Sequence, residues 1–329
     1  MVTEFGRVAG GTRVPARDAA VSRGAAGLRG GSPPRGEAGA RAEARGEPAG
    51  DGHVLTPRSA RVVAARKLQR RRDRDQSGLF LVEGPQAVRE ALAAGAVTEL
   101  FVEAGRDHDA LVALVGRALA DGVRVRTVST AGLTALAETV TPQGVVAVAR
   151  HRHVSLDEAL ARQPHLAVVL AGIADPGNAG TVLRTADAAG AGVVVFPEGS
   201  VDPYNGKCVR ASAGSLFHVD VVRGGTAEEA LTALRSASFT ILAADARGEH
   251  DLDSLLDAGR LTGRTAWVFG SEAHGLPGAT AELADARVRV PIHGRAESLN
   301  LAAAAAVCLY ASARALRPGR RRSGDTALG

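Results

Sequence analysis

Aromatic residues are scarce in this sequence, at 3% of 329 residues, so its cores must be built from Ala, Val and Leu. Cysteine is also rare. Cys208 and Cys308 lie far apart, and neither has a CxxC or His-x-Cys neighbour. This excludes a recognisable zinc site and a disulfide framework. We expect no bound metal, and two cysteines that act as small buried hydrophobic residues in a reducing compartment.

Long apolar runs are missing as well. The longest, Leu301–Ala311, is too short to span a bilayer, and no N-terminal apolar run has signal-peptide length. The formal net charge is +5, a mild basic excess that is compatible with a polyanionic partner without requiring one. We therefore expect a soluble, cytoplasmic protein without a membrane segment.

The pattern along the chain divides it into five parts. Residues 1–54 are rich in Gly, Ala, Arg and Pro without periodicity, so we expect them to be disordered. Strands expected at 79–83, 97–102, 123–128 and 145–149, with helices at 85–94 and 109–121, predict a small α/β/α sandwich over residues 55–150. A solvated polar linker follows at 151–155, with Ser155 and Glu158 placed as a helix capping box. A larger domain spans 156–317, before a basic tail at 318–329.

Eight basic residues between Arg58 and Arg74 face a single acid, Asp73. Val62, Ala65 and Leu68 recur at helical spacing, which predicts one amphipathic helix with a cationic face. A charged helix face is commonly just solvated, but this bias in sign favours contact with RNA phosphates. The residues assigned to that contact are Arg58, Arg61, Arg66, Lys67, Arg70, Arg71 and Arg72.

The larger domain alternates strands and helices. Strands are expected at 166–171, 192–196, 217–222, 239–244, 265–269 and 287–290, and helices at 156–162, 179–189, 226–236 and 299–314. This pattern predicts a mostly parallel sheet with helices on both faces. In such sheets a ligand lies beyond the carboxyl ends of the strands.

Three segments follow strands at those ends. In the first, residues 175–190, Asn178 lies near a helix start, Gly180 permits a close backbone approach, and Arg184 comes six residues after Asn178. The segment has neither a Walker A pattern nor the dinucleotide glycine fingerprint. It fits either an anion-binding helix start or an ordinary turn capped by asparagine.

The second segment, residues 267–277, reads WVFGSEAHGLP and carries Glu272, which is either a functional carboxylate or an N-cap of the next helix. The third, residues 288–314, places Ser298 and Asn300 at the start of an apolar helix that we expect to be deeply buried. Polar groups buried beside such a helix start need partners, and a ligand pocket would supply them.

The three segments together resemble the successive motifs of SpoU-type (TrmH-type) RNA methyltransferases: Asn178…Arg184, the GSExxGL segment and the ESLN run, in the family's order and spacing. The resemblance covers residues 165–315. The preceding RKLQRRRDRDQSGLFLVEGPQAVREAL is similar, less specifically, to a substrate-binding domain of that family. The resemblance implies the SPOUT fold, an α/β parallel sheet with a C-terminal trefoil knot, and a homodimer whose active site lies near the subunit interface.

The resemblance also implies residue roles. The cofactor S-adenosylmethionine (AdoMet) would be bound by Leu242, Ala243, Gly270, Ile292 and Leu299. The polar catalytic and substrate-binding set would be Asn178, Arg184, Glu272, Ser298 and Asn300. The implied reaction transfers a methyl group to a ribose 2′-hydroxyl of structured RNA, with 23S ribosomal RNA as the expected substrate.

The role of Arg184 is open between two chemistries. As a general base it would need a neutral guanidinium at pH 7, about 7–9 kcal/mol uphill from a pKa of about 12.5–13.8. As a cation it would clamp a phosphate and stabilise the developing alkoxide. The alternatives to rRNA methylation are a tRNA 2′-O-methyltransferase, an enzyme of the same fold acting on a base nitrogen, or a non-catalytic RNA-binding member. The sequence does not identify the modified nucleotide.

Overall fold

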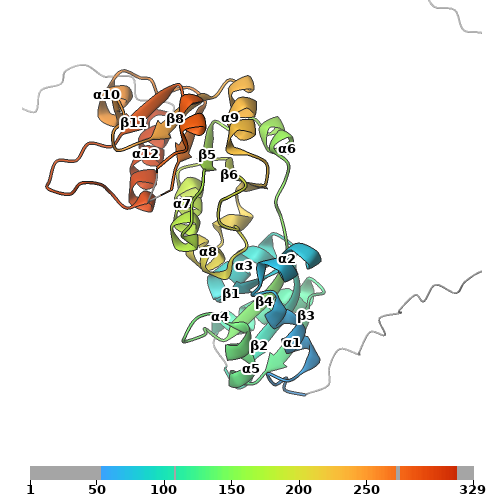
Figure 1. Cartoon of the computed structure of the whole chain (residues 1–329). Helices are drawn as coiled ribbons and strands as arrows, with labels where there is room; N and C mark the ends of the chain where they lie inside the picture. The colour runs from blue at the N-terminus through green and yellow to red at the C-terminus, as the bar shows by residue number, and fades with distance from the viewer. Residues whose placement is uncertain (1–52, 107–108, 272–274, 317–329) are drawn as a thin grey trace, which may run out of the picture. The chain divides into compact units, whose positions relative to one another are not determined.

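Two β-sheets, built from successive parts of the chain, carry the fold (Figure 1). The computed structural model describes residues 53–106, 109–271 and 275–316. These residues all belong to one unit, Ala49–Gly329. The expected disordered extension and the basic tail lie largely outside the described residues.

The first sheet has four strands in the order β1-β4-β2-β3, with β2 and β3 parallel and the other pairs antiparallel. Their bounds are β1 Leu79–Glu83, β2 Val97–Glu103, β3 Arg124–Val128 and β4 Val145–Arg150. Apolar side chains alternate between two cores. One core includes α3 (Pro85–Ala93) and α4 (Asp109–Ala120), and the other α1 (Ala60–Lys67) and α5 (Thr130–Leu136). The predicted α/β/α sandwich is confirmed, although α5 was not predicted.

The basic segment forms two short helices, so the single helix expected over 58–74 is wrong. Helix α1 ends at Lys67, and α2 (Arg71–Ser77) follows Arg70, whose backbone is extended. The physical reason is Arg74, which is buried and donates to the carbonyls of Leu68 and Gln69, each at 3.0 Å. These bonds satisfy carbonyl groups that the interrupted helix leaves without partners.

The second sheet has seven strands in the order β7-β6-β5-β10-β8-β11-β9, and its strand pairs are all parallel. The bounds are β5 Leu166–Leu170, β6 Val193–Phe196, β7 Asp220–Arg223, β8 Thr240–Ala244, β9 His250–Asp251, β10 Thr265–Phe269 and β11 Ala286–Arg289. The predicted α/β class with a parallel sheet is confirmed. The strand expected at 217–222 begins only at Asp220, because Ser215–Phe217 forms a short 3-10 helix, η1.

Helices cover both faces of this sheet (Figure 1). One core includes α7 (Pro176–Ala188), α8 (Gly206–Ser212), α10 (Leu252–Asp257) and α12 (Leu301–Leu316). The other includes α6 (Leu156–Ala161) and α9 (Ala227–Ser236), and α11 (Gly278–Glu282) packs beside α9. The fully buried Trp267 of β10 donates to the Ser312 hydroxyl of α12 at 2.9 Å, which fixes α12 to the centre of the sheet.

The segment between the sheets is exposed at Arg152, His153 and Ser155, as expected for a solvated linker, but His151 packs inward. His151 stacks on buried Tyr204, with ring centroids 3.9 Å apart, and the Tyr204 hydroxyl accepts from the Arg152 backbone at 2.8 Å. Burial lowers the pKa of His151 to about 4. The capping box of Ser155 and Glu158 is confirmed at the start of α6.

Within one chain, helix α12 is buried on one face only, and the deep burial predicted for it is not complete without a partner subunit. Ala305, Cys308 and Leu309 face the core, whereas Val307 and Tyr310 are 43% and 52% exposed. Both cysteines are buried and free, as predicted, and burial raises the pKa of Cys308 to about 12. Within the described ranges, no helix is long and apolar enough to cross a membrane.

Candidate active site

A pocket of about 610 Å³ lies where β8, β10 and β11 end side by side. Parallel pairing places the carboxyl ends of these three strands at one edge of the sheet. Three chain segments line the pocket: the residues after β8, the loop after β10, and the chain from β11 into α12. The volume lies in the range that holds a nucleoside-sized ligand.

The loop after β10 depends on a glycine. A Cβ atom at Gly270 would lie 2.5 Å from the Gly275 carbonyl carbon and 2.6 Å from the Leu276 nitrogen, so a side chain there would displace backbone. Ser271 and Gly275 bond to each other twice, at 3.0 and 2.8 Å. This closure keeps Gly270, Ser271 and Gly275 together in the pocket wall.

Asn178 and Asn300 come together from segments more than a hundred residues apart. The Asn300 amide donates to the Asn178 side-chain oxygen at 3.3 Å. The Asn300 side-chain oxygen also accepts from the Ala302 backbone at 2.9 Å, at the start of α12. Asn300 lines the pocket, so the first and third predicted motifs meet at its edge.

Helix α7 begins at Pro176 with Asp175 as its N-cap, so the reading of Asn178 as the cap is wrong. Asp175 accepts from the Asn178 backbone at 2.7 Å and from Lys207 at 2.5 Å. The close approach expected at Gly180 is to a neighbouring helix, because a Cβ there would lie 2.3 Å from the Cys208 carbonyl oxygen of α8.

Arg184 lies on the exposed face of α7 and does not line the pocket. Its guanidinium has no partner among the described residues. The structure therefore does not bring Arg184 to the other predicted polar residues within one chain.

The remaining predicted pocket residues divide into two groups. Gly270, Ile292, Leu299 and Ser298 line the pocket, whereas Leu242 and Ala243 are buried within β8. Ala244, the last residue of β8, is the first residue of that strand to line the pocket. Residues 297–300 are exposed, so the expected burial of the start of α12 is wrong.

Glu272 lies outside the described residues. The following helix, α11, has Pro277 at its N-cap, so the alternative of Glu272 as that cap is wrong. Sequence reasoning missed two charged lining residues, Asp245 and Arg247. The available signal was their position directly after a strand of a parallel sheet.

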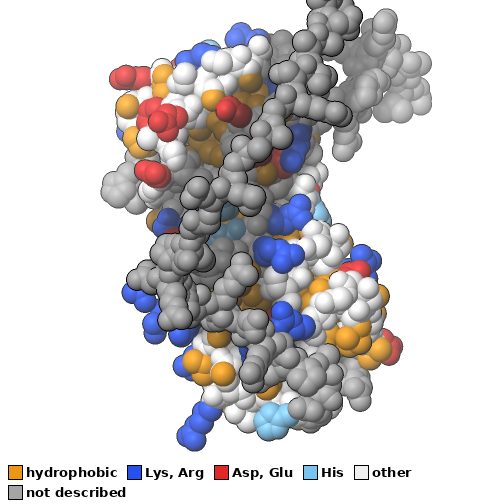
Figure 2. All heavy atoms as spheres, turned by 90° about the vertical axis from the view of Figure 1, so that its right-hand side faces the viewer, with side chains coloured by type: hydrophobic (Ala, Val, Ile, Leu, Met, Phe, Trp, Pro, Cys, Tyr) orange, Lys and Arg blue, Asp and Glu red, His pale blue; other side chains and the backbone are white. Residues whose placement is uncertain are grey.

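The seven basic residues assigned to RNA contact are all exposed. Two are in ion pairs with acids of the same segment, Arg71 with Asp75 at 3.7 Å and Arg72 with Asp73 at 3.9 Å. Figure 2, from the right-hand side of Figure 1, shows Lys and Arg side chains at several separate places on that face. Arg74 is structural, because it is buried in an ion pair with Asp202 at 2.7 Å.

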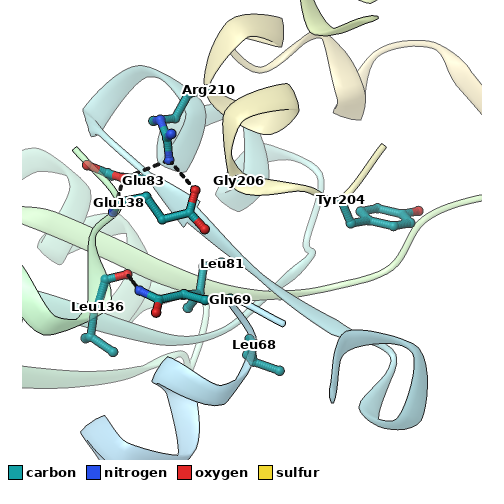
Figure 3. A pocket seen from close by; sticks show the side chains of 9 residues that line it. All are labelled: Leu68, Gln69, Leu81, Glu83, Leu136, Glu138, Tyr204, Gly206 and Arg210. Atoms are coloured by element: carbon teal, nitrogen blue, oxygen red, sulfur yellow. Dashed lines mark hydrogen bonds and ion pairs between the residues drawn. The ribbon is translucent and has the colours of Figure 1, made fainter. Parts of the chain in front are cut away.

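A second pocket, of only about 10 Å³, has an ion-pair cluster at its wall (Figure 3). Arg210 of α8 pairs there with Glu138 at 3.0 Å and Glu83 at 3.3 Å. Such a space holds about one water molecule, so this cluster is structural. In the part of the chain that the structure describes, no group of three His, Cys, Asp or Glu side chains could hold a metal ion.

Comparison with known proteins identifies the class. The SpoU rRNA Methylase family model matches residues 165–310, and the MRM3-like substrate binding domain model matches residues 59–147. The chain is 32% identical over 258 residues to the 23S rRNA (guanosine(2553)-2′-O)-methyltransferase RlmP of Bacillus subtilis, covering 78% of this chain and 97% of that protein. The chain therefore belongs to the SpoU rRNA methylase family.

Solved structures agree with this assignment. An AdoMet-bound rRNA methyltransferase from Sinorhizobium meliloti is 29% identical with a TM-score of 0.71, covering 80% of this chain and 98% of that one. The SpoU methyltransferase AviRb from Streptomyces viridochromogenes, in complex with AdoMet, is 32% identical with a TM-score of 0.67, covering 78% of this chain and 98% of that one.

Proposed function

We propose that this protein transfers a methyl group from AdoMet to a ribose 2′-hydroxyl of 23S ribosomal RNA. The observation that carries the proposal is the pocket of about 610 Å³ at the carboxyl ends of β8, β10 and β11, with Ser298 and Asn300 in its wall. Relatives that match nearly their whole length support the substrate class, since they are named as 23S rRNA 2′-O-methyltransferases.

The residues present fit AdoMet. Gly270 leaves no room for a side chain, so backbone groups form that wall, while Ile292 and Leu299 add apolar surface. Peptide groups and apolar side chains together suit a nucleoside with a hydrophobic tail. Bound AdoMet would supply an electrophilic methyl group. The trefoil knot of the SPOUT fold stays a prediction for the segments that wall this pocket.

The asparagine pair can orient the acceptor ribose. Asn300 is held by Asn178 and by the start of α12, so its amide has a fixed direction at the pocket edge. A methyl transfer of this kind requires alignment of the attacking oxygen with the methyl carbon and removal of the hydroxyl proton. We assign alignment to Asn178, Asn300 and Ser298, with Glu272 retained as a predicted member of this set.

Arg184 can act in a homodimer, in which the arginine of one protomer reaches the pocket of its partner. Two observations support this. Arg184 is exposed and separate from the pocket of its own chain, and Val307 and Tyr310 expose apolar surface on α12, the helix that packs against α7. A solvated guanidinium suits the cationic clamp of the two chemistries weighed for Arg184.

Mixing two inactive variants tests this arrangement. Arg184→Ala keeps an intact pocket, and Gly270→Val keeps an intact arginine. If the arginine acts across a twofold interface, half of the randomly mixed dimers hold one complete site, which restores about a quarter of wild-type activity. No recovery in a mixture shown to exchange subunits would place Arg184 in its own chain's site.

We assign contact with the rRNA phosphates to the exposed basic residues of the first domain. Arg70, Arg71 and Arg72 follow one another at the start of α2, and charge of one sign on a surface attracts phosphates. Replacing the three by Gln should weaken rRNA binding and make its salt dependence shallower. An unchanged affinity and salt slope would contradict the assignment.

Methyl transfer from tritiated AdoMet to undermodified ribosomal RNA tests the function directly. We expect label in 23S rRNA as an alkali-resistant dinucleotide, because a 2′-O-methyl group blocks hydrolysis of the adjacent phosphodiester. A DNA copy of the same sequence is the control, since it lacks the 2′-hydroxyl. Label in tRNA alone would indicate a tRNA 2′-O-methyltransferase, and label on a base would indicate a base methyltransferase; either result would replace the proposal. We expect the reaction to occur in the cytoplasm.

A further inference from the structure

The pocket has a charge pattern that the reaction outlined above does not use. Three charged side chains line it among the described residues: Asp245, Arg247 and Glu297. Arg247 is the single cation that the described part of the lining contains. A cationic side chain at a pocket mouth is commonly just solvated. Whether Arg247 is positioned to bind a ligand therefore depends on the contacts around it.

A tight turn at the end of β8 fixes the backbone of Arg247. The Asp245 carboxylate accepts from the Arg247 backbone N–H at 2.8 Å, and the Asp245 carbonyl accepts from Gly248 at 2.9 Å. The Asp245 backbone N–H in turn donates to the Val288 carbonyl of β11 at 3.0 Å. The turn is thus anchored to the sheet, and the backbone of Arg247 has a defined position in the pocket wall.

The neighbouring arginines differ from Arg247. Arg287 pairs with Glu249 at 3.0 Å, and Arg289 donates to the Gly248 carbonyl at 3.0 Å. Neither lines the pocket. Within the described ranges, no side chain or carbonyl bonds the Arg247 guanidinium. The arginine that faces the pocket is therefore the one left available to a ligand.

We propose that Arg247 binds the α-carboxylate of the methionyl part of AdoMet, an assignment that rests on the proposed function. A guanidinium presents a planar pair of donors that matches a carboxylate. AdoMet carries two positive groups, sulfonium and ammonium, and one carboxylate. Among the described residues, the lining carries groups of opposite charge to these: the two carboxylates of Asp245 and Glu297, and one guanidinium.

Calorimetric titration with AdoMet and with its decarboxylated analogue isolates this contact. Arg247→Gln removes the guanidinium, and Arg287→Gln is a matched control that removes an exposed arginine of the adjoining strand outside the pocket. We expect Arg247→Gln to weaken AdoMet binding about fivefold, as for a solvent-accessible ion pair, and to leave the analogue unchanged. Arg287→Gln should bind both ligands as the wild type does.

The outcomes distinguish failure of the Arg247 assignment from failure of the proposed function. Equal losses for AdoMet and the analogue would overturn the proposal, since Arg247 would then shape the pocket without contacting the carboxylate. Unchanged AdoMet affinity with weakened RNA binding would also overturn it and assign Arg247 to an RNA phosphate. If the wild type and Arg287→Gln bound neither ligand, the proposed function itself would fail.

Discussion

Replacing Gly270 by alanine should weaken cofactor binding while leaving the sheet intact. The new Cβ would lie 2.5 Å from the Gly275 carbonyl carbon, a distance that only movement of the loop can relieve. That movement breaks the two bonds between Ser271 and Gly275. At about 1 kcal/mol net for each bond, re-forming the loop around a ligand costs about 2 kcal/mol. AdoMet should then bind about 30-fold more weakly.

Calorimetric titration with AdoMet measures the affinity, and thermal unfolding reports on the fold. Gly278→Ala is the matched control, because a Cβ at that helical glycine meets nothing within 4 Å. We expect the control to bind AdoMet normally. Gly270 lies beyond the end of β10, so the unfolding midpoint of Gly270→Ala should fall by no more than about 4 °C. AdoMet affinity within twofold of wild type would refute this account of the loop.

Arg74→Met leaves the Asp202 carboxylate buried without Arg74, so it should lower the free energy of unfolding, measured by urea denaturation, by about 3–5 kcal/mol. Arg72→Met, which replaces an exposed arginine, should leave the free energy of unfolding unchanged. A loss below about 1 kcal/mol for Arg74→Met would contradict the buried pair. The pKa of His151 is lowered to about 4, so between pH 6.5 and 4 the unfolded state binds a proton that the folded state does not. Wild-type stability should therefore decrease as the pH is lowered from 6.5 to 4, and the stability of His151→Phe should decrease less. Identical pH profiles for the two proteins would count against burial of the ring. Asn300→Ala removes the cap of α12 and the contact to Asn178, so it should cost about 1 kcal/mol of stability and at least tenfold in kcat/KM for methyl transfer.

The parallel sheet could be predicted from sequence because its central strands are nearly uninterrupted apolar runs. LAVVL at Leu166–Leu170 and TAWVF at Thr265–Phe269 are buried along their whole length, as expected for strands covered on both faces. The ordered motifs likewise placed Gly270, Ser298 and Asn300 at one pocket. These features could be predicted because short stretches of sequence determine them.

Tertiary contacts decided what sequence patterns missed. Arg74 is indistinguishable in sequence from its basic neighbours, yet it is buried against Asp202 and bonds the carbonyls of Leu68 and Gln69 where the expected helix is interrupted. Helix α8 spans only seven residues, too few for a periodic pattern to show. The composition of α12 gave its apolar character but not which face stays exposed, because that depends on what packs against it.

The strand order β10-β8-β11 has a consequence for how the protein is made. Each pairing joins strands separated by other elements, and the last part of the pocket wall is the start of α12, near the end of the described chain. Synthesis runs from the N-terminus, and non-local pairing is slow. The pocket can close only after α12 has emerged from the ribosome. A nascent chain would therefore be unable to methylate RNA until α12 had been synthesised.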